Sequence, residues 1–142
     1  MKTDEEIIKI FKQKAKFRIF CDCIFLFVAT LLVVVLFTCN LDCIVIFLIS
    51  MILFCCVTSI YDIYIRFYNL KSIKEGNYSI CIKPTVGNVS ASNGGSLFVD
   101  VKDCDEGFAF SSTKIENFSN KVYCVTTKKG TYAVCFCKED RI

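Results

Sequence analysis

The residues with the greatest chemical capacity in this chain are its 11 cysteines. Cys135 and Cys137 are separated by one residue, which would place two thiols on the same face of a strand. A strong zinc signal would be two CxxC pairs separated by a loop, and the sequence has none. An odd number of cysteines spread over the whole chain is also a poor disulfide framework. We therefore interpret them as small buried hydrophobic residues in a reducing compartment, with a thiol or metal site as the alternative.

No other combination of residues forms a recognisable catalytic set. The sequence contains no histidine, which removes Ser/His catalysis, Cys/His catalysis and imidazole metal sites together. The acidic run at 102–106 has too few acidic positions for a calcium loop, so we interpret it as a solvated turn. The sequence therefore predicts no catalytic, cofactor-binding or metal residue, no cofactor, and a protein that is not an enzyme.

The composition changes near the middle of the chain. Apolar residues crowd the first half, whereas all 6 glycines and the single proline, Pro84, lie after position 75. The net charge of +3 comes with no Lys-rich or Arg-rich run, so nucleic acid is not a predicted partner. We predict a membrane-embedded first half and a small water-soluble second half.

Two uncharged tracts, 23–41 and 43–61, are each long enough to cross a bilayer. At 1.5 Å per residue, about 20 apolar residues span a hydrocarbon core of about 30 Å. One crossing followed by a buried helix is disfavoured, because the second tract is apolar on every face. Between the tracts lies the hexapeptide TCNLDC (38–43), whose Asn40 and Asp42 suit a tight turn. The sequence predicts a transmembrane helical hairpin with this hexapeptide at its outer tip.

Basic residues flank the hairpin at its open end only, and the tip has none. They are Lys9, Lys12, Lys14, Lys16 and Arg18 before the first span, and Arg66, Lys71 and Lys74 after the second. The positive-inside rule predicts a multi-pass protein of the cell (inner) membrane with both termini in the cytoplasm. A cleaved signal peptide is disfavoured, since no small-residue cleavage site ends the first tract and a second span follows at once.

Both helices are expected to continue beyond the bilayer. Thr3 and Glu6 have the spacing of a capping box, and Gly76 follows a basic last turn, as at a helix end. These extensions would pack as a short antiparallel stalk or lie on anionic lipid. The predicted segments are a cytosolic amphipathic helix at 1–18, transmembrane helices at 19–39 and 43–62, an outer turn at 40–42, a cytosolic helical extension at 63–75 and a cytosolic β domain at 76–142.

Two further patterns depend on the side of the membrane that each segment faces. Asn77, Asn88 and Asn117 each begin an Asn-x-Ser triplet, which is a glycosylation acceptor in a eukaryotic lumen. Five thiols in the same half and the basic flanks argue against that location, so we interpret the triplets as chance matches. Cys39 and Cys43 flank the outer tip at helical spacing, and a disulfide between them is an open alternative.

From residue 77 the apolar pattern changes to the period of two that is typical of strands. A helical turn is expected where Thr113 and Glu116 repeat the capping-box spacing. The turn KKG (128–130) makes the last two strands a hairpin. The predicted strands are 78–83, 96–102, 107–111, 122–127 and 131–137, with a weaker one at 86–90.

Five short strands with one helical turn before the last hairpin predict a small all-β barrel, SH3-like or OB-like. A half-open sheet packed on the stalk is the alternative. The fold class is therefore an α+β membrane protein, a helical hairpin followed by a small barrel. The predicted core is Ile80, Ile82, Leu97, Val99, Val101, Phe108, Phe110, Val122, Cys124, Tyr132, Val134 and Phe136. On the last strand, we expect Tyr132, Val134 and Phe136 to face one way, and Ala133, Cys135 and Cys137 the other.

The layout of the chain resembles small two-span membrane proteins of Clostridia-type bacteria that carry a C-terminal cytosolic β domain. The segments that carry the resemblance are IKEGNYSICI (73–82), GGSLFVDVKD (94–103) and KVYCVTTKKGTYAVCFC (121–137). It implies the architecture and no particular activity. More distantly, the architecture is similar to membrane effectors of bacterial anti-phage systems, which sense a cyclic nucleotide through a barrel and disrupt the membrane.

These observations predict a membrane-anchored, non-enzymatic interaction protein. Its partners would be the lipid bilayer and, through the β domain, a protein partner or another copy of the chain at an exposed sheet edge. The alternative is a ligand-sensing membrane effector, in which the barrel binds a small molecule such as a nucleotide signal and the oligomerised hairpin perturbs the membrane.

Overall fold

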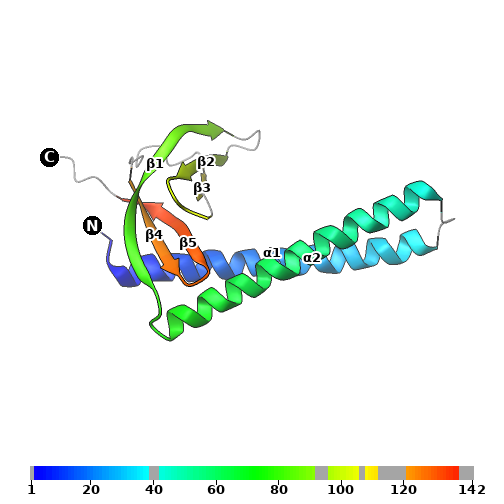
Figure 1. The fold of residues 1–142 in the computed structure, drawn as a ribbon, viewed down its shortest axis with the longest axis horizontal. Helices are drawn as coiled ribbons and strands as arrows, with labels where there is room; N and C mark the ends of the chain where they lie inside the picture. The colour runs from blue at the N-terminus through cyan, green and yellow to red at the C-terminus, as the bar shows by residue number, and fades with distance from the viewer. Residues whose placement is uncertain (1, 39–41, 92–95, 106–107, 112–120, 138–142) are drawn as a thin grey trace. The chain divides into compact units, whose positions relative to one another are not determined.

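A computed structural model describes residues 2–38, 42–91, 96–105, 108–111 and 121–137 (Figure 1). The chain divides into two compact units. The helical unit is Lys14–Tyr68, and the β unit combines Met1–Gln13 with Asn69–Ile142. Helices α1 (Asp4–Phe37) and α2 (Cys43–Lys74) each contribute residues to both units.

The first turn of α1 carries the capping box that the sequence predicts. The backbone N–H of Glu6 donates to Oγ1 of Thr3 at 3.4 Å, and the N–H of Thr3 donates to Oε2 of Glu6 at 3.1 Å. Two orphan backbone donors are thereby satisfied at the start of the helix. The helix then continues without a break to Phe37.

The end of α2 also follows the sequence expectation. Gly76 adopts a φ of +75°, the left-handed conformation that glycine accepts without steric cost. The N–H of Gly76 donates to the carbonyl of Ile73 at 3.2 Å, and the N–H of Asn77 donates to that of Ser72 at 2.8 Å. This pair of bonds is the Schellman arrangement, which closes the helix and turns the chain into the first strand.

The helical unit turns most of its large apolar side chains outward. Phe27 is 66% exposed and Phe54 69% exposed, whereas Ala29 and Ile49 are buried. Both helices are long and apolar enough to cross a membrane by length and composition. The reversal between them falls on residues 39–41, which lie outside the described part of the chain.

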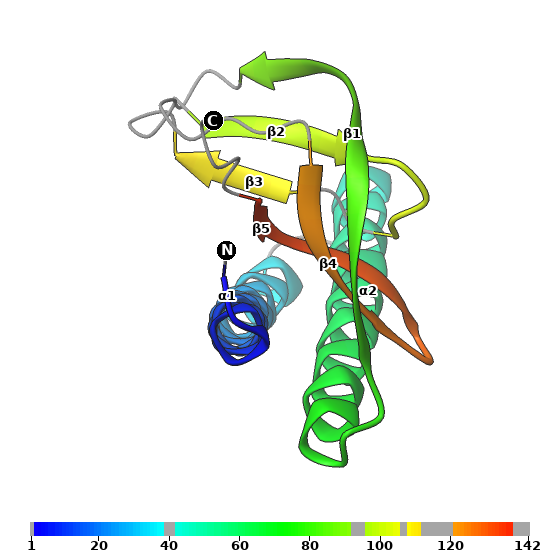
Figure 2. The ribbon, with the colours of Figure 1, turned by 90° about the vertical axis from the view of Figure 1, so that its left-hand side faces the viewer.

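The β unit contains one curled antiparallel sheet of five strands in the order β3-β2-β1-β4-β5 (Figure 2). The two strands at the ends of this order, β3 and β5, approach each other. The strands are β1 (Ser79–Ala91), β2 (Ser96–Val101), β3 (Phe108–Ser111), β4 (Lys121–Thr127) and β5 (Gly130–Phe136). The predicted helical turn near Thr113 falls in the range 112–120, outside the described residues.

Strand β1 replaces two strands that the sequence analysis separated, and it changes partner part-way along. Its first half pairs with β4, from Ser79 opposite Thr126 to Pro84 opposite Lys121. Its second half pairs with β2, beginning with Thr85 opposite Val101. A proline usually interrupts a strand because it has no N–H. Here Pro84 occupies the point at which the ladder passes from one neighbour to the other, so the strand continues.

The expected alternation on β5 is wrong, because the ladder contains an irregularity. Tyr123 pairs with Cys135, but the next residue of β4, Cys124, pairs with Ala133. Val134 is therefore an extra residue, and a bulge of this kind shifts the following side chains to the opposite face. By this pairing, Ala133 lies on the same face as Phe136, and Tyr132 on the same face as Cys135.

The core of the β unit lies on both faces of β4. One face packs the cluster Val101, Val122, Cys124 and Ala133, with Cys81, Cys104 and Phe136 against it. Tyr132 and Val134 are buried as predicted, but Ile82 is 50% exposed and Ile80 only half-buried, so the core prediction is wrong for Ile82. The side chains of Leu97, Val99, Phe108 and Phe110 lie outside the described part.

The other face of β4 and β5 packs against the helix ends that belong to the same unit. The rings of Phe11 and Tyr132 lie 6.0 Å apart, centroid to centroid, at an interplanar angle of 59°. The hydroxyl of Thr127 donates to Oδ1 of the buried Asn69 at 2.7 Å. The helix ends thus add apolar and hydrogen-bonding contacts to a β unit that is small and would be marginally stable by itself.

Candidate functional site

Three thiols that are distant in sequence meet on one face of the sheet. Cys81 and Cys124 are directly opposite each other on β1 and β4. Cys104 follows β2 in a loop, and its Sγ lies 3.4 Å from Sγ of Cys124. Sequence reasoning considered Cys135 and Cys137 instead, because their spacing is local. The group that involves Cys104 depends on strand order and leaves no sequence signal.

The environment of Cys124 makes it a core residue with little thiol reactivity. Its side chain has no exposed surface, and burial raises the pKa of the thiol, with the neighbouring Cys104 thiol adding to the effect. A thiol held protonated is a poor nucleophile and a poor metal ligand. Within the described ranges, no three Cys, Asp or Glu side chains gather so as to hold a metal ion.

Cys135 and Cys137 surround the phenol of Tyr123 on the opposite face of the sheet. Burial raises the pKa of Tyr123, and Cys137 and Cys135 both contribute to the shift. Burial likewise raises the pKa of Cys137, partly offset by its hydrogen bond with Tyr123. Both cysteines are buried, so their arrangement fits packing and hydrogen bonding to a tyrosine.

The acidic loop after β2 holds the β4–β5 turn in place. Oδ2 of Asp105 accepts the backbone N–H of Thr131 at 2.7 Å, and the N–H of Asp105 donates to the carbonyl of Thr131 at 2.9 Å. Gly130 has a φ of +146°, and a Cβ atom there would lie 2.5 Å from Oδ2 of Asp105. The carboxylate is therefore a structural acceptor. Glu106 lies outside the described residues.

The first half of β1 has backbone groups that point away from β4, the strand with which it pairs. The N–H of Lys102 donates to the carbonyl of Pro84 at 3.2 Å, so this carbonyl points to the β2 side. Hydrogen-bonding direction alternates along an antiparallel strand, so Ile82 and Ile80 point the same way. β2 begins its pairing opposite Thr85. Among the described residues, no strand lies beside Ile80 and Ile82 on that side.

The segment 78–82, whose outward backbone groups have no neighbouring strand among the described residues, also exposes apolar side chains. Ile82 is 50% exposed and Tyr78 is 37% exposed. The segment 78–82 carries no charge and no proline. Natural proteins usually protect a free strand edge with charges, proline or a bulge. We call residues 78–82 the β1 edge, and it is the strongest candidate for an interaction site in the β unit. Figure 2 shows β2 alongside the C-terminal part of β1 and not alongside the β1 edge.

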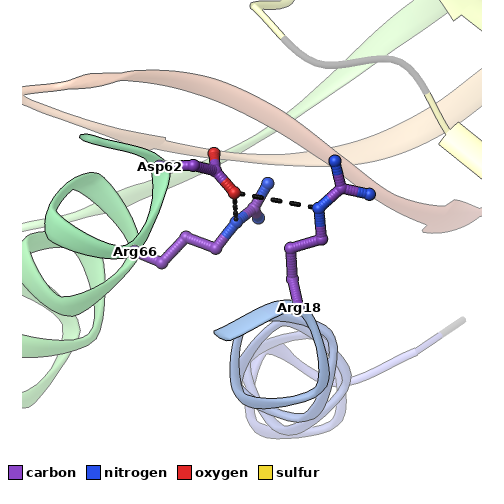
Figure 3. A network of polar contacts seen from close by, with 3 residues as sticks. All are labelled: Arg18, Asp62 and Arg66. Atoms are coloured by element: carbon purple, nitrogen blue, oxygen red, sulfur yellow. Dashed lines mark hydrogen bonds and ion pairs between the residues drawn. The ribbon is translucent and has the colours of Figure 1, made fainter. Parts of the chain in front are cut away.

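An ionic network links α1 and α2 within the helical unit (Figure 3). Nε of Arg66 donates to Oδ2 of Asp62 at 2.9 Å, and Nε of Arg18 lies 3.7 Å from the same oxygen. From the sequence, Asp22 and Asp62 lie at the same inner end of the spans, where interfacial ion pairs with Arg18 or Arg66 are expected, and the pairs of Asp62 are confirmed. Asp22, one turn after Arg18, has a buried Oδ2 with no hydrogen-bond partner in the described part of the chain. The network joins the two helices where the basic flank meets the apolar tract.

Some predicted features cannot be placed. Cys39 lies outside the described residues, so the proposed disulfide with Cys43 stays untested, as does the triplet at Asn117. Asn77 is exposed at the entry to β1, whereas the side chain of Asn88 is not described.

Comparisons with known proteins identify no relative. No protein-family model matches the chain, and neither a curated protein nor a solved structure matches it. The resemblance to small clostridial membrane proteins therefore stays a prediction, and the functional argument depends on the chain's own geometry.

Proposed function

We propose that this chain is a membrane-anchored, non-enzymatic interaction protein. The observation that carries the proposal is the contrast between two surfaces. The helical unit presents apolar side chains on all sides along two span-length helices, which suits lipid. The β unit presents one uncharged, unpaired strand edge, which suits a protein strand.

The proposed topology places both termini in the cytoplasm of a cell with an inner membrane. Support comes from the basic residues, which flank the open end of the hairpin and include Arg18 and Arg66 of the ionic network. The test is a C-terminal fusion to green fluorescent protein, compared with a fusion to alkaline phosphatase. Fluorescence without phosphatase activity is expected, and the reverse pattern would overturn the topology.

The proposed fold of the β unit is OB-like. The sheet order β3-β2-β1-β4-β5, with β3 approaching β5, supports a partly open, five-stranded Greek-key barrel. A barrel of this class tolerates many surface functions, so the fold itself does not select a ligand. The β1 edge, and not a pocket, is the feature on which we base the interaction function.

The decisive experiment is photo-crosslinking in intact membranes. A photoreactive amino acid replaces Ile82 on the β1 edge or, as the control, the exposed Lys128 in the β4–β5 turn. We expect protein adducts from position 82 and none from position 128. Equal adducts from both positions, or none from position 82, would overturn the interaction function.

The membrane-effector alternative makes a different prediction. If the oligomerised hairpin perturbs the membrane, inducible overexpression should depolarise cells. Under the interaction function, membrane potential stays unchanged at high expression. A potential-sensitive dye measured before and after induction separates the two. The control is Leu31→Arg, which we expect to weaken membrane insertion of the hairpin.

A further inference from the structure

We propose that the occupant of the β1 edge is the β1 edge of a second copy of this chain, paired antiparallel about a two-fold axis at Ile80. This inference rests on the proposed interaction function and names its partner. It starts from the backbone groups of Ile80 and Ile82, which point away from β4 and meet no strand among the described residues.

Symmetry allows only a few registers for two identical strands. Outward-pointing residues must face outward-pointing residues, which an axis at Ser79, Ile80 or Cys81 would satisfy. An axis at Ser79 would place Ile82 opposite Gly76, whose φ of +75° is not that of a strand. An axis at Cys81 would place Pro84 opposite Tyr78 of the second copy. Pro84 has no N–H, and its carbonyl already accepts from Lys102. An axis at Ile80 avoids Pro84 and uses the full N–H and C=O groups of residues 78, 80 and 82.

The side chains are self-complementary in the register centred on Ile80. Tyr78 of one copy stands opposite Ile82 of the other, and the same pair repeats across the axis. These are the two apolar side chains that the edge leaves most exposed. Pairs of an aromatic with a β-branched residue stabilise neighbouring strands. No charge occurs from Tyr78 to Ile82, so the pairing brings no like charges together.

The membrane anchor favours this occupant over a free peptide. Two copies held in one membrane meet at a high effective concentration, which lowers the cost of association. An edge of five residues is short, and a short edge needs such help to form a persistent contact. A two-fold pairing also covers both edges at once, and so closes the surface instead of propagating a fibre.

The first test compares two variants of the full chain in membranes. Chains with two different affinity tags are expressed together, extracted in mild detergent and purified through one tag. Ile82→Pro removes an outward N–H and leaves the β4 ladder intact, whereas Ile82→Val keeps the edge. We expect the recovered second tag to fall about 10- to 100-fold for Ile82→Pro and to change less than about 3-fold for Ile82→Val.

Protease resistance of the β unit shows whether Ile82→Pro remains folded. If it unfolds, the charge-pair variants provide the same test without proline. Tyr78→Lys and Ile82→Glu each reduce recovery, and the double variant restores it, because the introduced ammonium and carboxylate face each other across the axis. Failure of the double variant to recover, or wild-type recovery in folded Ile82→Pro, would overturn the pairing.

The photo-crosslink at position 82 separates this inference from the interaction function. An adduct of twice the chain mass that contains both tags supports self-pairing. An adduct with a different protein keeps the interaction function and overturns self-pairing. Absence of any adduct overturns both.

Discussion

Large apolar side chains face outward in the helical unit and inward in the β unit. In the helical unit, Phe27 and Phe54 are about two-thirds exposed, whereas Val122 and Val125 of the β unit have no exposed surface. The β unit hides its apolar residues from water by packing two faces of β4. The described residues of the helical unit form two helices, with no second layer that covers their outer faces. This contrast is what the proposed membrane anchor requires, with a β unit folded for water and a helical unit whose exposed apolar surface suits lipid.

The largest expected effect is from a charge placed inside the β unit. Val125→Asp would bury a carboxylate without a partner, which we expect to cost about 4 kcal/mol or more in free energy of unfolding and to unfold the unit. Limited proteolysis should then degrade the C-terminal half while the hairpin stays in the membrane. The control is Ser79→Asp, at an exposed position of β1 that faces the uncharged Thr126, and it should remain protease-resistant. Equal resistance of both variants would contradict the assigned core.

A charge placed on the outer surface of the helical unit tests whether that surface contacts lipid. Leu31→Arg, at an exposed position of α1, should make membrane insertion less favourable by about 3 kcal/mol. In water the same substitution would be neutral. The measurement is the fraction of chain that resists extraction by alkaline carbonate, with Leu31→Phe as the control. An unchanged fraction would argue that α1 does not contact lipid at this position.

A smaller effect is expected where the sheet meets the helix ends within the β unit. Thr127→Val removes the hydroxyl that donates to Asn69 and leaves a buried amide oxygen unsatisfied, at a cost of about 1–3 kcal/mol. Thr126→Val is the matched control, because its hydroxyl pairs with Thr131 nearer the surface. Urea unfolding of the detergent-solubilised protein should show a larger loss of unfolding free energy for Thr127→Val than for Thr126→Val. A larger loss for Thr126→Val would mean that the Thr127–Asn69 hydrogen bond contributes less to stability than the Thr126–Thr131 contact.

The smallest expected effect is the change in the free energy of unfolding with pH. Burial raises the pKa of Cys124 in the folded state. Above a pH of about 8.5 the thiol ionises in the unfolded chain but stays protonated in the folded one, so stability is complete below that pH and falls as pH rises. The slope reaches at most about 1.4 kcal/mol per pH unit for one group. Raised pKa values of Cys137 and Tyr123 act in the same direction.

Unfolding measured from pH 7 to pH 10 checks this sign. Cys124→Ala should lower stability at every pH and flatten the slope, whereas Cys43→Ala, at an exposed position outside the β unit, should leave the slope unchanged. An equally steep slope in Cys124→Ala would assign the pH dependence to other groups.

Local signals in the sequence were sufficient for the helices and most strands. The capping box of Thr3 and Glu6 and the left-handed Gly76 are properties of a few neighbouring residues, and both are present as predicted. Strands β2, β3, β4 and β5 lie within one residue of their predicted ends. Such features depend on backbone sterics and short-range hydrogen bonds, which act in the same way in any fold.

The errors occurred where a strand's neighbours decide its structure. The sequence analysis separated strand 78–83 from a weaker strand at 86–90, but the two are one strand, whose ladder changes partner at Pro84. The alternation of β5 failed at Val134 because a bulge is a property of two strands together. Ile82 was assigned to the core because its pattern alternates, but it is half-exposed, and the pairing of β2 with β1 begins only at Thr85.

The sequence by itself determined the two span-length helices, the start of α1, the end of α2 and the β4–β5 turn, because each depends on composition or on contacts within one turn. Only the tertiary structure decided which thiols meet, which face each residue of β5 occupies and which part of β1 remains unpaired. Those properties depend on strand order and register, which bring together residues as distant as Cys81 and Cys124. The proposed interaction site belongs to this second group, since a strand edge is free only when the surrounding strands leave it so.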